Sequence, residues 1–224
     1  MKVVPEQIKA IVFDFDDTLV DEKYWIIERW RKTILFAEEE LNIKGFGEYF
    51  WEIFKKNGPK YKFHVNDTLE KLKSNTNFLS IIVNHFLSQK VDEKLFCDST
   101  YCLKRLYKNY KLGIITDGKE IIQIERLKNA KILNYFEIII CTNNTPKPNK
   151  NCYLECAEKL GYDPKQCVYV SHDIDTDLKG AKKSGYKTVL LDLNYKHKNK
   201  WLNQKKLVDN HCYSFKEIDQ LFNS

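Results

Sequence analysis

Two aspartates stand where the first apolar run of the chain, residues 10–15 (AIVFDF), gives way to polar sequence. Because side chains alternate along a strand, Asp14 and Asp16 are expected on one side, with Phe15 opposite. Two neighbouring carboxylates repel each other, which is costly unless a cation or a shared proton compensates. Carboxylate oxygens together with water suit Mg²⁺. The pair therefore predicts a magnesium-binding site at the end of this strand.

Polar clusters also follow three later apolar runs of the chain. Their members are Thr116, Asp117 and Gly118 after one run, Lys147 after the next, and Ser171, His172, Asp173 and Asp177 after the third. In open α/β sheets, ligands bind at the carboxyl ends of the strands. Lys147 would add a positive point charge that can pair with a carboxylate and with a phosphate oxygen. A parallel sheet would bring all four clusters to one edge, and we expect a single site there.

The apolar runs have the character of strands in such a sheet. Five runs rich in β-branched residues are continuous, as in strands that are buried on both faces: residues 10–15, 112–116, 136–142, 167–171 and 188–192. Helical patterns separate the later runs, at residues 119–128, 150–160 and 177–184. Strand and helix alternating at this spacing predict an α/β fold with a doubly wound, mostly parallel sheet.

A long helical segment interrupts this alternation after the first strand. Apolar residues recur there at helical spacing, as in Ile26, Ile27, Trp30 and Ile34. We predict an inserted all-helical domain at residues 20–97, with residues 1–19 and 98–224 forming the sheet domain. The aromatic side chains of the insert are expected to form its core.

Composition limits the class of protein. With 224 residues, of which 43% are hydrophobic, the chain can form a packed sheet domain and a smaller insert. It has no apolar run of membrane-spanning length and no signal-peptide pattern at the N-terminus, which predicts a cytoplasmic protein without a membrane partner. The seven cysteines form no CxxC pair and are expected to be reduced thiols. The net charge is +6, but the lysines are spread along the chain among 31 acidic residues, so nucleic acid is not an expected partner, even for the basic stretch at 195–206.

The polar clusters resemble the motifs of the haloacid dehalogenase-like (HAD) superfamily. FDFDDTLV resembles its first motif, hhhDxDxT with an apolar residue after the threonine, LGIITDG its second, KPNKNCY its third and DLKGAKKSGYKTV the tail of its fourth. The match covers residues 8–20 and 98–222, in the order of the family. The insert stands where members with a helical cap carry that cap. The resemblance implies a Rossmann-like sheet domain with an inserted helical cap.

The resemblance also implies a reaction, the Mg²⁺-dependent hydrolysis of a small phosphomonoester. Asp14 would be the nucleophile that forms an aspartyl-phosphate, and Asp16 the acid that protonates the leaving oxygen and then activates water. The Thr116 hydroxyl, the backbone N–H groups of Asp117 and Gly118, and Lys147 would stabilise the transferring phosphoryl group. Asp14, the carbonyl of Asp16 and a carboxylate of the fourth cluster would bind the metal.

The fourth cluster departs from the family pattern, in which glycine and a metal-binding aspartate follow the strand. Counting from the strand puts His172 at the metal position, whereas counting back from Asp177 permits Asp173. Because Mg²⁺ prefers oxygen ligands, we predict Asp173 as the ligand, with Asp177 orienting Lys147 or a metal-bound water. An imidazole at this position would instead favour Zn²⁺, Ni²⁺ or Mn²⁺.

Three other functions are compatible with the sequence, one of them a phosphomutase, which would use the same constellation of residues. A dehalogenase on the same fold also uses the strand-one aspartate, but it needs neither a metal nor Asp16. A degenerate family member could retain only a binding or regulatory role, for which the unusual fourth cluster is the argument. The sequence identifies neither the substrate nor the oligomeric state.

Overall fold

The computed structural model describes residues 7–143, 145–193 and 200–223 and divides the chain into two compact units. One unit contains the sheet and comprises Met1–Asp21 and Glu93–Ser224, and the other, Glu22–Asp92, is helical. Residues 195–199 of the basic stretch lie outside the described residues. No described helix combines the length and the apolar character that crossing a bilayer requires.

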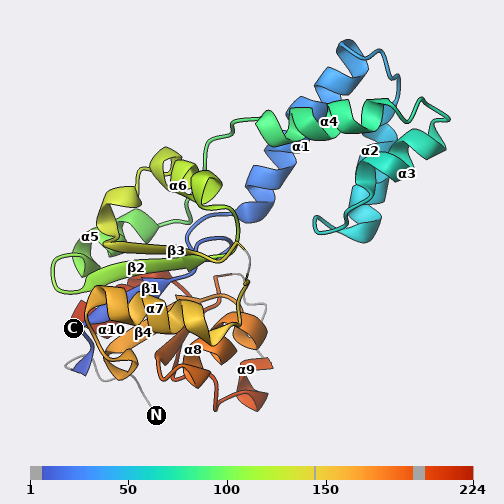
Figure 1. The fold of residues 1–224 in the computed structure, drawn as a ribbon. Coiled ribbons are helices and arrows are strands. Elements are labelled where there is room, and N and C mark those ends of the chain that lie inside the picture. The colour runs from blue at the N-terminus through green and yellow to red at the C-terminus, as the bar shows by residue number, and fades with distance from the viewer. Residues whose placement is uncertain (1–6, 144, 194–199, 224) are drawn as a thin grey trace. The chain divides into compact units, whose positions relative to one another are not determined.

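The sheet unit is built on six parallel strands in the order β3-β2-β1-β4-β5-β6 (Figure 1). The strands are β1 (Ala10–Phe13), β2 (Lys111–Thr116), β3 (Ile138–Cys141), β4 (Cys167–Ser171), β5 (Lys187–Leu191) and β6 (Asn210–Cys212). The first strand lies in the middle of the sheet, and the order reverses beside it. The predicted doubly wound parallel sheet is therefore confirmed, and the carboxyl end of β1 lies at the switch point, where such sheets bind ligands.

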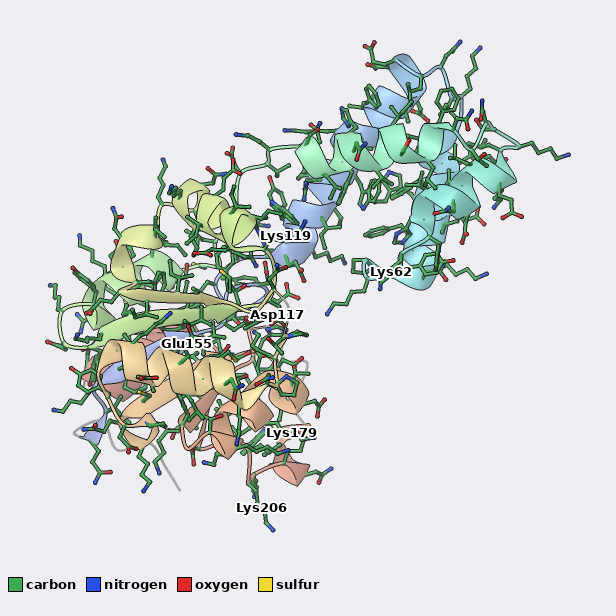
Figure 2. The ribbon with its side chains drawn as sticks, viewed as in Figure 1. Lys62, Asp117, Lys119, Glu155, Lys179 and Lys206 are labelled. Carbon is green, nitrogen blue, oxygen red and sulfur yellow. The ribbon has the colours of Figure 1, made fainter. Side chains whose placement is uncertain are left out.

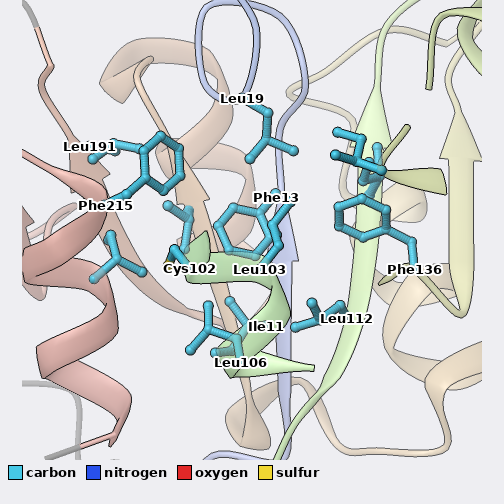
Figure 3. Packing of buried hydrophobic residues seen from close by; sticks show 14 of the residues in the cluster. Ile11, Phe13, Leu19, Cys102, Leu103, Leu106, Leu112, Phe136, Leu191 and Phe215 are labelled. Carbon is cyan, nitrogen blue, oxygen red and sulfur yellow. The ribbon is translucent and has the colours of Figure 1, made fainter. Parts of the chain in front are cut away.

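Side chains of β1 alternate between two hydrophobic clusters, one on each face of the sheet. Ile11 and Phe13 face the cluster formed with α5 (Ser99–Leu106), α6 (Glu120–Asn129) and α10 (Phe215–Asn223). Figure 3 shows these two residues packed among Leu103, Leu106 and Phe215. Ala10 and Val12 face the second cluster, formed with α7 (Lys150–Leu160) and α8 (Lys179–Lys183). Burial on both faces explains why this strand is an uninterrupted apolar run in the sequence.

The helical unit contains four helices, α1 (Glu22–Glu39), α2 (Phe46–Asn57), α3 (His64–Lys71) and α4 (Phe78–Ser88). Aromatic rings form much of its core. Trp30 stacks on Phe86 with ring centroids 4.0 Å apart and lies 4.4 Å from Phe50. These ring contacts join α1, α2 and α4, so this unit has a hydrophobic core of its own.

The two crossings between the units run side by side within the sheet unit. The Asp21 amide donates to the Lys94 carbonyl at 2.9 Å, the Phe96 amide donates to the Leu19 carbonyl at 3.0 Å, and Val20 forms an antiparallel bridge with Leu95. The chain thus leaves the sheet unit and returns to it through a short two-stranded stem.

The helix after β4 begins earlier than its sequence pattern predicts. We expected a helix over residues 177–184, whereas a π-helical turn, η4 (Ile174–Leu178), precedes α8. The cause is Asp173, whose carboxylate accepts hydrogen bonds from the amides of Asp175 and Thr176 and so caps the turn. The Leu178 amide then bonds to the Asp173 carbonyl, five residues earlier. The short remaining helices are η2 (Leu133–Tyr135), η3 (Pro164–Gln166) and α9 (Lys200–Asn203).

Candidate active site

Asp14 directly follows the central strand at the carboxyl edge of the sheet. Its amide donates to the Val170 carbonyl of β4 at 3.0 Å, which continues the β1–β4 pairing by one residue. Figure 2 shows Asp117 beside the carboxyl end of the neighbouring strand β2. The polar clusters after β1, β2 and β4 therefore meet at one edge, as the sequence predicts for a parallel sheet.

Asp14 is 4% exposed and both of its carboxylate oxygens have partners. Oδ1 accepts from the Lys147 ammonium at 2.7 Å, and Oδ2 accepts from the Thr18 hydroxyl at 2.8 Å, with His172 Nδ1 3.4 Å away. Burial raises the pKa of Asp14, but Lys147 and His172 outweigh it, and the pKa ends well below its usual range. The carboxylate is therefore ionised, the form in which it can act as a nucleophile.

Lys147 lies between two buried carboxylates. Besides Asp14, its ammonium contacts Oδ2 of Asp177 at 2.9 Å, and Ser171 donates to the same oxygen at 2.8 Å. Burial lowers the pKa of Lys147, but the two carboxylates outweigh it and raise that pKa overall. Burial and the nearby Asp14 raise the pKa of Asp177 to about 6 despite the attraction of Lys147. Asp177, expected to orient Lys147 or a water, thus contacts the ammonium directly.

The second cluster is held in shape by a glutamine that the sequence motifs do not include. Gln123, in the first turns of α6, donates to the Thr116 hydroxyl oxygen at 2.8 Å and to the Asp117 carbonyl at 2.7 Å. The Asp117 carboxylate accepts from the Thr142 hydroxyl, and from the Lys147 amide at 3.1 Å. The loop between β2 and α6 is therefore tied both to α6 and to the segment that carries Lys147.

The Asp16 side chain contacts two residues of α6. Its Oδ1 is 2.7 Å from Nη1 of Arg126, a contact without hydrogen-bond alignment, and its Oδ2 accepts from Gln123 at 3.2 Å. Burial and the charge of Asp14 raise the pKa of Asp16 against the opposing effect of Arg126. Sequence analysis missed Arg126 and Gln123. Their three-residue spacing on one helix, directly after the TDG sequence, was the available signal.

The fourth cluster brings His172, rather than Asp173, against the nucleophile. The His172 imidazole lies 3.2 Å from the Thr18 hydroxyl as well as close to Asp14. Burial lowers the pKa of His172, but the hydrogen bond and charge of Asp14 outweigh it and raise that pKa. Oδ1 of Asp173 accepts from the amides of its own loop, at 2.8 Å from Asp175 and 3.0 Å from Thr176. In the described part of the chain, no three His, Cys, Asp or Glu side chains form a ready-made metal cluster.

Comparison with known proteins identifies the family. The model of the family described as haloacid dehalogenase-like hydrolase matches residues 11–191. The chain belongs to this family. A glyceraldehyde 3-phosphate phosphatase of Methanopyrus kandleri is 27% identical to it over 81% of this chain and 83% of the relative. An N-acylneuraminate-9-phosphatase of Mus musculus is 22% identical over 82% of each chain.

Solved structures of low sequence identity share the fold. The magnesium-bound HAD hydrolase YfnB from Bacillus subtilis has a TM-score of 0.72 at 16% identity, covering 97% of this chain and 99% of that one. A 2-haloacid dehalogenase from Pseudomonas syringae has a TM-score of 0.68 at 19% identity, covering 96% and 98%. The family match and the curated relatives confirm the predictions of the superfamily and of an enzyme of the phosphatase class.

Proposed function

We propose that this HAD phosphatase hydrolyses a small phosphomonoester through an aspartyl-phosphate on Asp14, with the help of a divalent cation. The observation that carries the proposal is the buried, ionised Asp14 carboxylate, paired with Lys147 at the carboxyl end of the central strand. A carboxylate desolvated in this way and turned to the ligand-binding edge of the sheet suits nucleophilic attack on phosphorus.

The chain's own residues account for the proton and bond changes of both steps. In the first, a carboxylate oxygen of Asp14 bonds to phosphorus while the bond to the leaving oxygen breaks, and Asp16 gives that oxygen a proton. In the second, Asp16 takes a proton from water, whose oxygen attacks phosphorus and releases Asp14 and inorganic phosphate. The burial that raises the pKa of Asp16 favours the protonated form that the first step needs.

The second cluster supplies donors for the phosphoryl oxygens. Because Gln123 donates to the hydroxyl oxygen of Thr116, the hydroxyl hydrogen is directed to another acceptor. A phosphoryl oxygen would be that acceptor, together with the backbone amides of Asp117 and Gly118 as further donors. Lys147 would offset the negative charge that the transition state spreads over the phosphoryl oxygens.

A divalent cation would bind beside Asp14. Asp14 and the carbonyl of Asp16 would hold it, together with one side chain of the fourth cluster. The close approach of His172 to Oδ2 of Asp14 favours His172 for that position, and Asp173 stays a prediction. Bound there, the cation would supply positive charge to the transferring group. The YfnB neighbour is described as magnesium-bound, whereas an imidazole ligand suits Mn²⁺ better than Mg²⁺.

The substrate class, the role of the helical unit and the location in the cell belong to the same proposal. The curated relatives are named for glyceraldehyde 3-phosphate and an N-acylneuraminate 9-phosphate, which supports a small phosphorylated metabolite. The unit Glu22–Asp92, with its own core, would act as the cap that helps to select this substrate. The free state of all seven cysteines is consistent with the reducing cytoplasm.

A phosphate-release screen of phosphorylated metabolites, run with Mg²⁺ and with Mn²⁺, tests the proposal. We expect turnover of at least one phosphomonoester, and a phosphorylated Asp14 after acid quenching, detected by mass spectrometry. Chloride release from 2-chloropropionate in a parallel assay would indicate a dehalogenase instead. Binding of phosphate analogues without any turnover would indicate a degenerate binding protein.

A further inference from the structure

A buried arginine joins Asp16 to an acidic residue far away in the sequence. Arg126 is 6% exposed and projects from α6. Its Nε and Nη2 atoms donate to the two carboxylate oxygens of Glu93 at 2.6 and 3.1 Å, and its Nη1 atom faces Oδ1 of Asp16 at 2.7 Å. Glu93, whose side chain is 0% exposed, is the first residue of the sheet unit after the helical insert.

The contacts of Arg126 fix the guanidinium group from several sides. The two-pronged bond to Glu93 sets the plane of the group, because both partners are planar. A further hydrogen bond runs from Nη1 to Gln123 at 3.2 Å, and the group lies 4.9 Å from the centre of the Phe15 ring. A guanidinium held in this way has little freedom to follow a moving partner.

Asp16 makes fewer hydrogen bonds than Arg126 and is more exposed. One of its oxygens contacts Arg126 by charge without the alignment of a hydrogen bond, and the other accepts a 3.2 Å bond from Gln123. Its side chain is 21% exposed, compared with 0% for Glu93. The Arg126–Glu93 pair is therefore the more buried and more fully hydrogen-bonded part of the trio, and the proposed acid is the more exposed part.

We propose that Arg126 is a positioning residue for Asp16, and that Glu93 holds Arg126 in place for this task. The inference rests on the proposed function, in which Asp16 moves the proton. If Arg126 served only the stability of the fold, Glu93 alone would balance its charge. The same guanidinium also contacts Asp16, which comes from the catalytic loop. The pair thus keeps the Asp16 carboxylate at the edge of the site, within reach of the leaving oxygen and the water.

Leaving-group dependence tests this proposal. An alkyl phosphate needs the proton from Asp16 as its bond to phosphorus breaks, whereas p-nitrophenolate leaves readily without one. We expect Arg126→Met to lower kcat/KM, which reports formation of the phospho-enzyme, by about 10²-fold for an alkyl phosphate, the scale of a misplaced catalytic group, with a smaller loss for p-nitrophenyl phosphate. Glu93→Gln should show the same selectivity in milder form, and Arg126→Lys, which cannot contact both acids as a fork, should restore only part of the rate.

A double-mutant cycle separates positioning from general damage to the fold. If Arg126 acts through Asp16, the Asp16→Asn, Arg126→Met double variant should be no slower on the alkyl phosphate than Asp16→Asn alone. The matched control is Arg105→Met, which removes a 2.8 Å arginine–aspartate pair with Asp219 elsewhere in the sheet unit and should leave the substrate ratio unchanged. Multiplicative losses in the cycle, or equal losses of kcat/KM on both substrates, would overturn the proposal.

Two further results complete the test. If Arg126→Met does not fold, the test uses Glu93→Gln and Arg126→Lys. The quantity compared is the ratio of activity on the alkyl phosphate to activity on p-nitrophenyl phosphate, and a wild-type ratio in both variants would overturn the proposal. If the wild-type chain hydrolyses no phosphomonoester, the proposed function fails by itself. Crystal structures of the same two variants then test the positioning, which is refuted if the Asp16 carboxylate stays in place.

Discussion

Gly180 lies so close to Tyr153 that no side chain fits between them. A Cβ atom at Gly180 would stand 2.7 Å from Cε2 and 2.8 Å from the hydroxyl oxygen of Tyr153, and 3.0 Å from the carbonyl oxygen of Pro148. The Tyr153 hydroxyl donates to the Asp177 carbonyl at 3.0 Å. Because Gly180 has no side chain, α8 can pack closely against α7. The contact lies next to Asp177, whose carboxylate binds Lys147.

Gly180→Ala should destabilise the protein although alanine is the better helix former. Helix propensity alone would stabilise the variant by roughly 1 kcal/mol, but overpacking a buried contact costs about 1–3 kcal/mol. The midpoint of chemical denaturation should fall, and phosphate release should fall with it, because Tyr153 and the Asp177 backbone are displaced. Lys183→Ala, at an exposed position of the same helix, is the control and should change stability by no more than about 0.5 kcal/mol. A Gly180→Ala variant as stable as the wild type would contradict the close packing.

Asp14→Asn should abolish turnover while the protein stays folded. The change is nearly isosteric and removes the proposed nucleophile, so no phosphate should be released and no phosphorylated protein should form. Circular dichroism and the denaturation midpoint serve as the folding controls. A variant that keeps a tenth of the wild-type kcat would exclude Asp14 as the nucleophile.

His172→Asp should change the metal preference of the site. A carboxylate in place of the imidazole adds the oxygen ligand that Mg²⁺ prefers, so affinity for Mg²⁺ should rise relative to Mn²⁺. Calorimetric titration of each metal measures this directly, independently of activity. If Asp173 is the ligand instead, His172→Gly leaves Mg²⁺ affinity unchanged and Asp173→Ala removes it.

The sequence predicted the sheet well, because its strands are buried on both faces and therefore read as continuous apolar runs. It also predicted which clusters meet, since the carboxyl ends of parallel strands share one edge. It did not predict the pairing of Arg126 with Glu93, because a charged residue on a helix and another in a linker carry no periodic signal. Counting residues could not decide between His172 and Asp173, because that choice depends on how Asp173 caps its own turn.

The stability of the helical unit should depend on pH through His64. This side chain is 3% exposed among aromatic rings, and burial lowers its pKa, so the fold favours the neutral imidazole. In the unfolded chain the pKa of this histidine is about 6.5. The neutral imidazole contributes fully to the free energy of unfolding above that pH. The contribution is lost as the pH falls further, because the unfolded chain then binds the proton more readily than the folded one. His64→Phe should therefore unfold with a smaller difference in denaturation midpoint between pH 8 and pH 5.5.

Tryptophan fluorescence reports mainly on the helical unit, because three of the four tryptophans, Trp25, Trp30 and Trp51, belong to it. Burial also lowers the pKa of His85, so this residue should account for the pH dependence of stability that remains in the His64 variant. The variant His85→Phe tests that contribution separately. An unchanged pH dependence in the His64 variant would contradict the assignment.

The two-stranded stem at the crossings has a consequence for how this architecture can evolve. Its bonds, from Asp21 to Lys94 and from Phe96 to Leu19, lie entirely within the sheet unit, so the stem closes without help from the insert. The entropy of closing a loop grows only slowly with its length, so the stem tolerates inserts of very different size. If residues 22–92 select the substrate as proposed, recombination at the stem would exchange one specificity for another while the chemistry of the sheet edge is inherited unchanged.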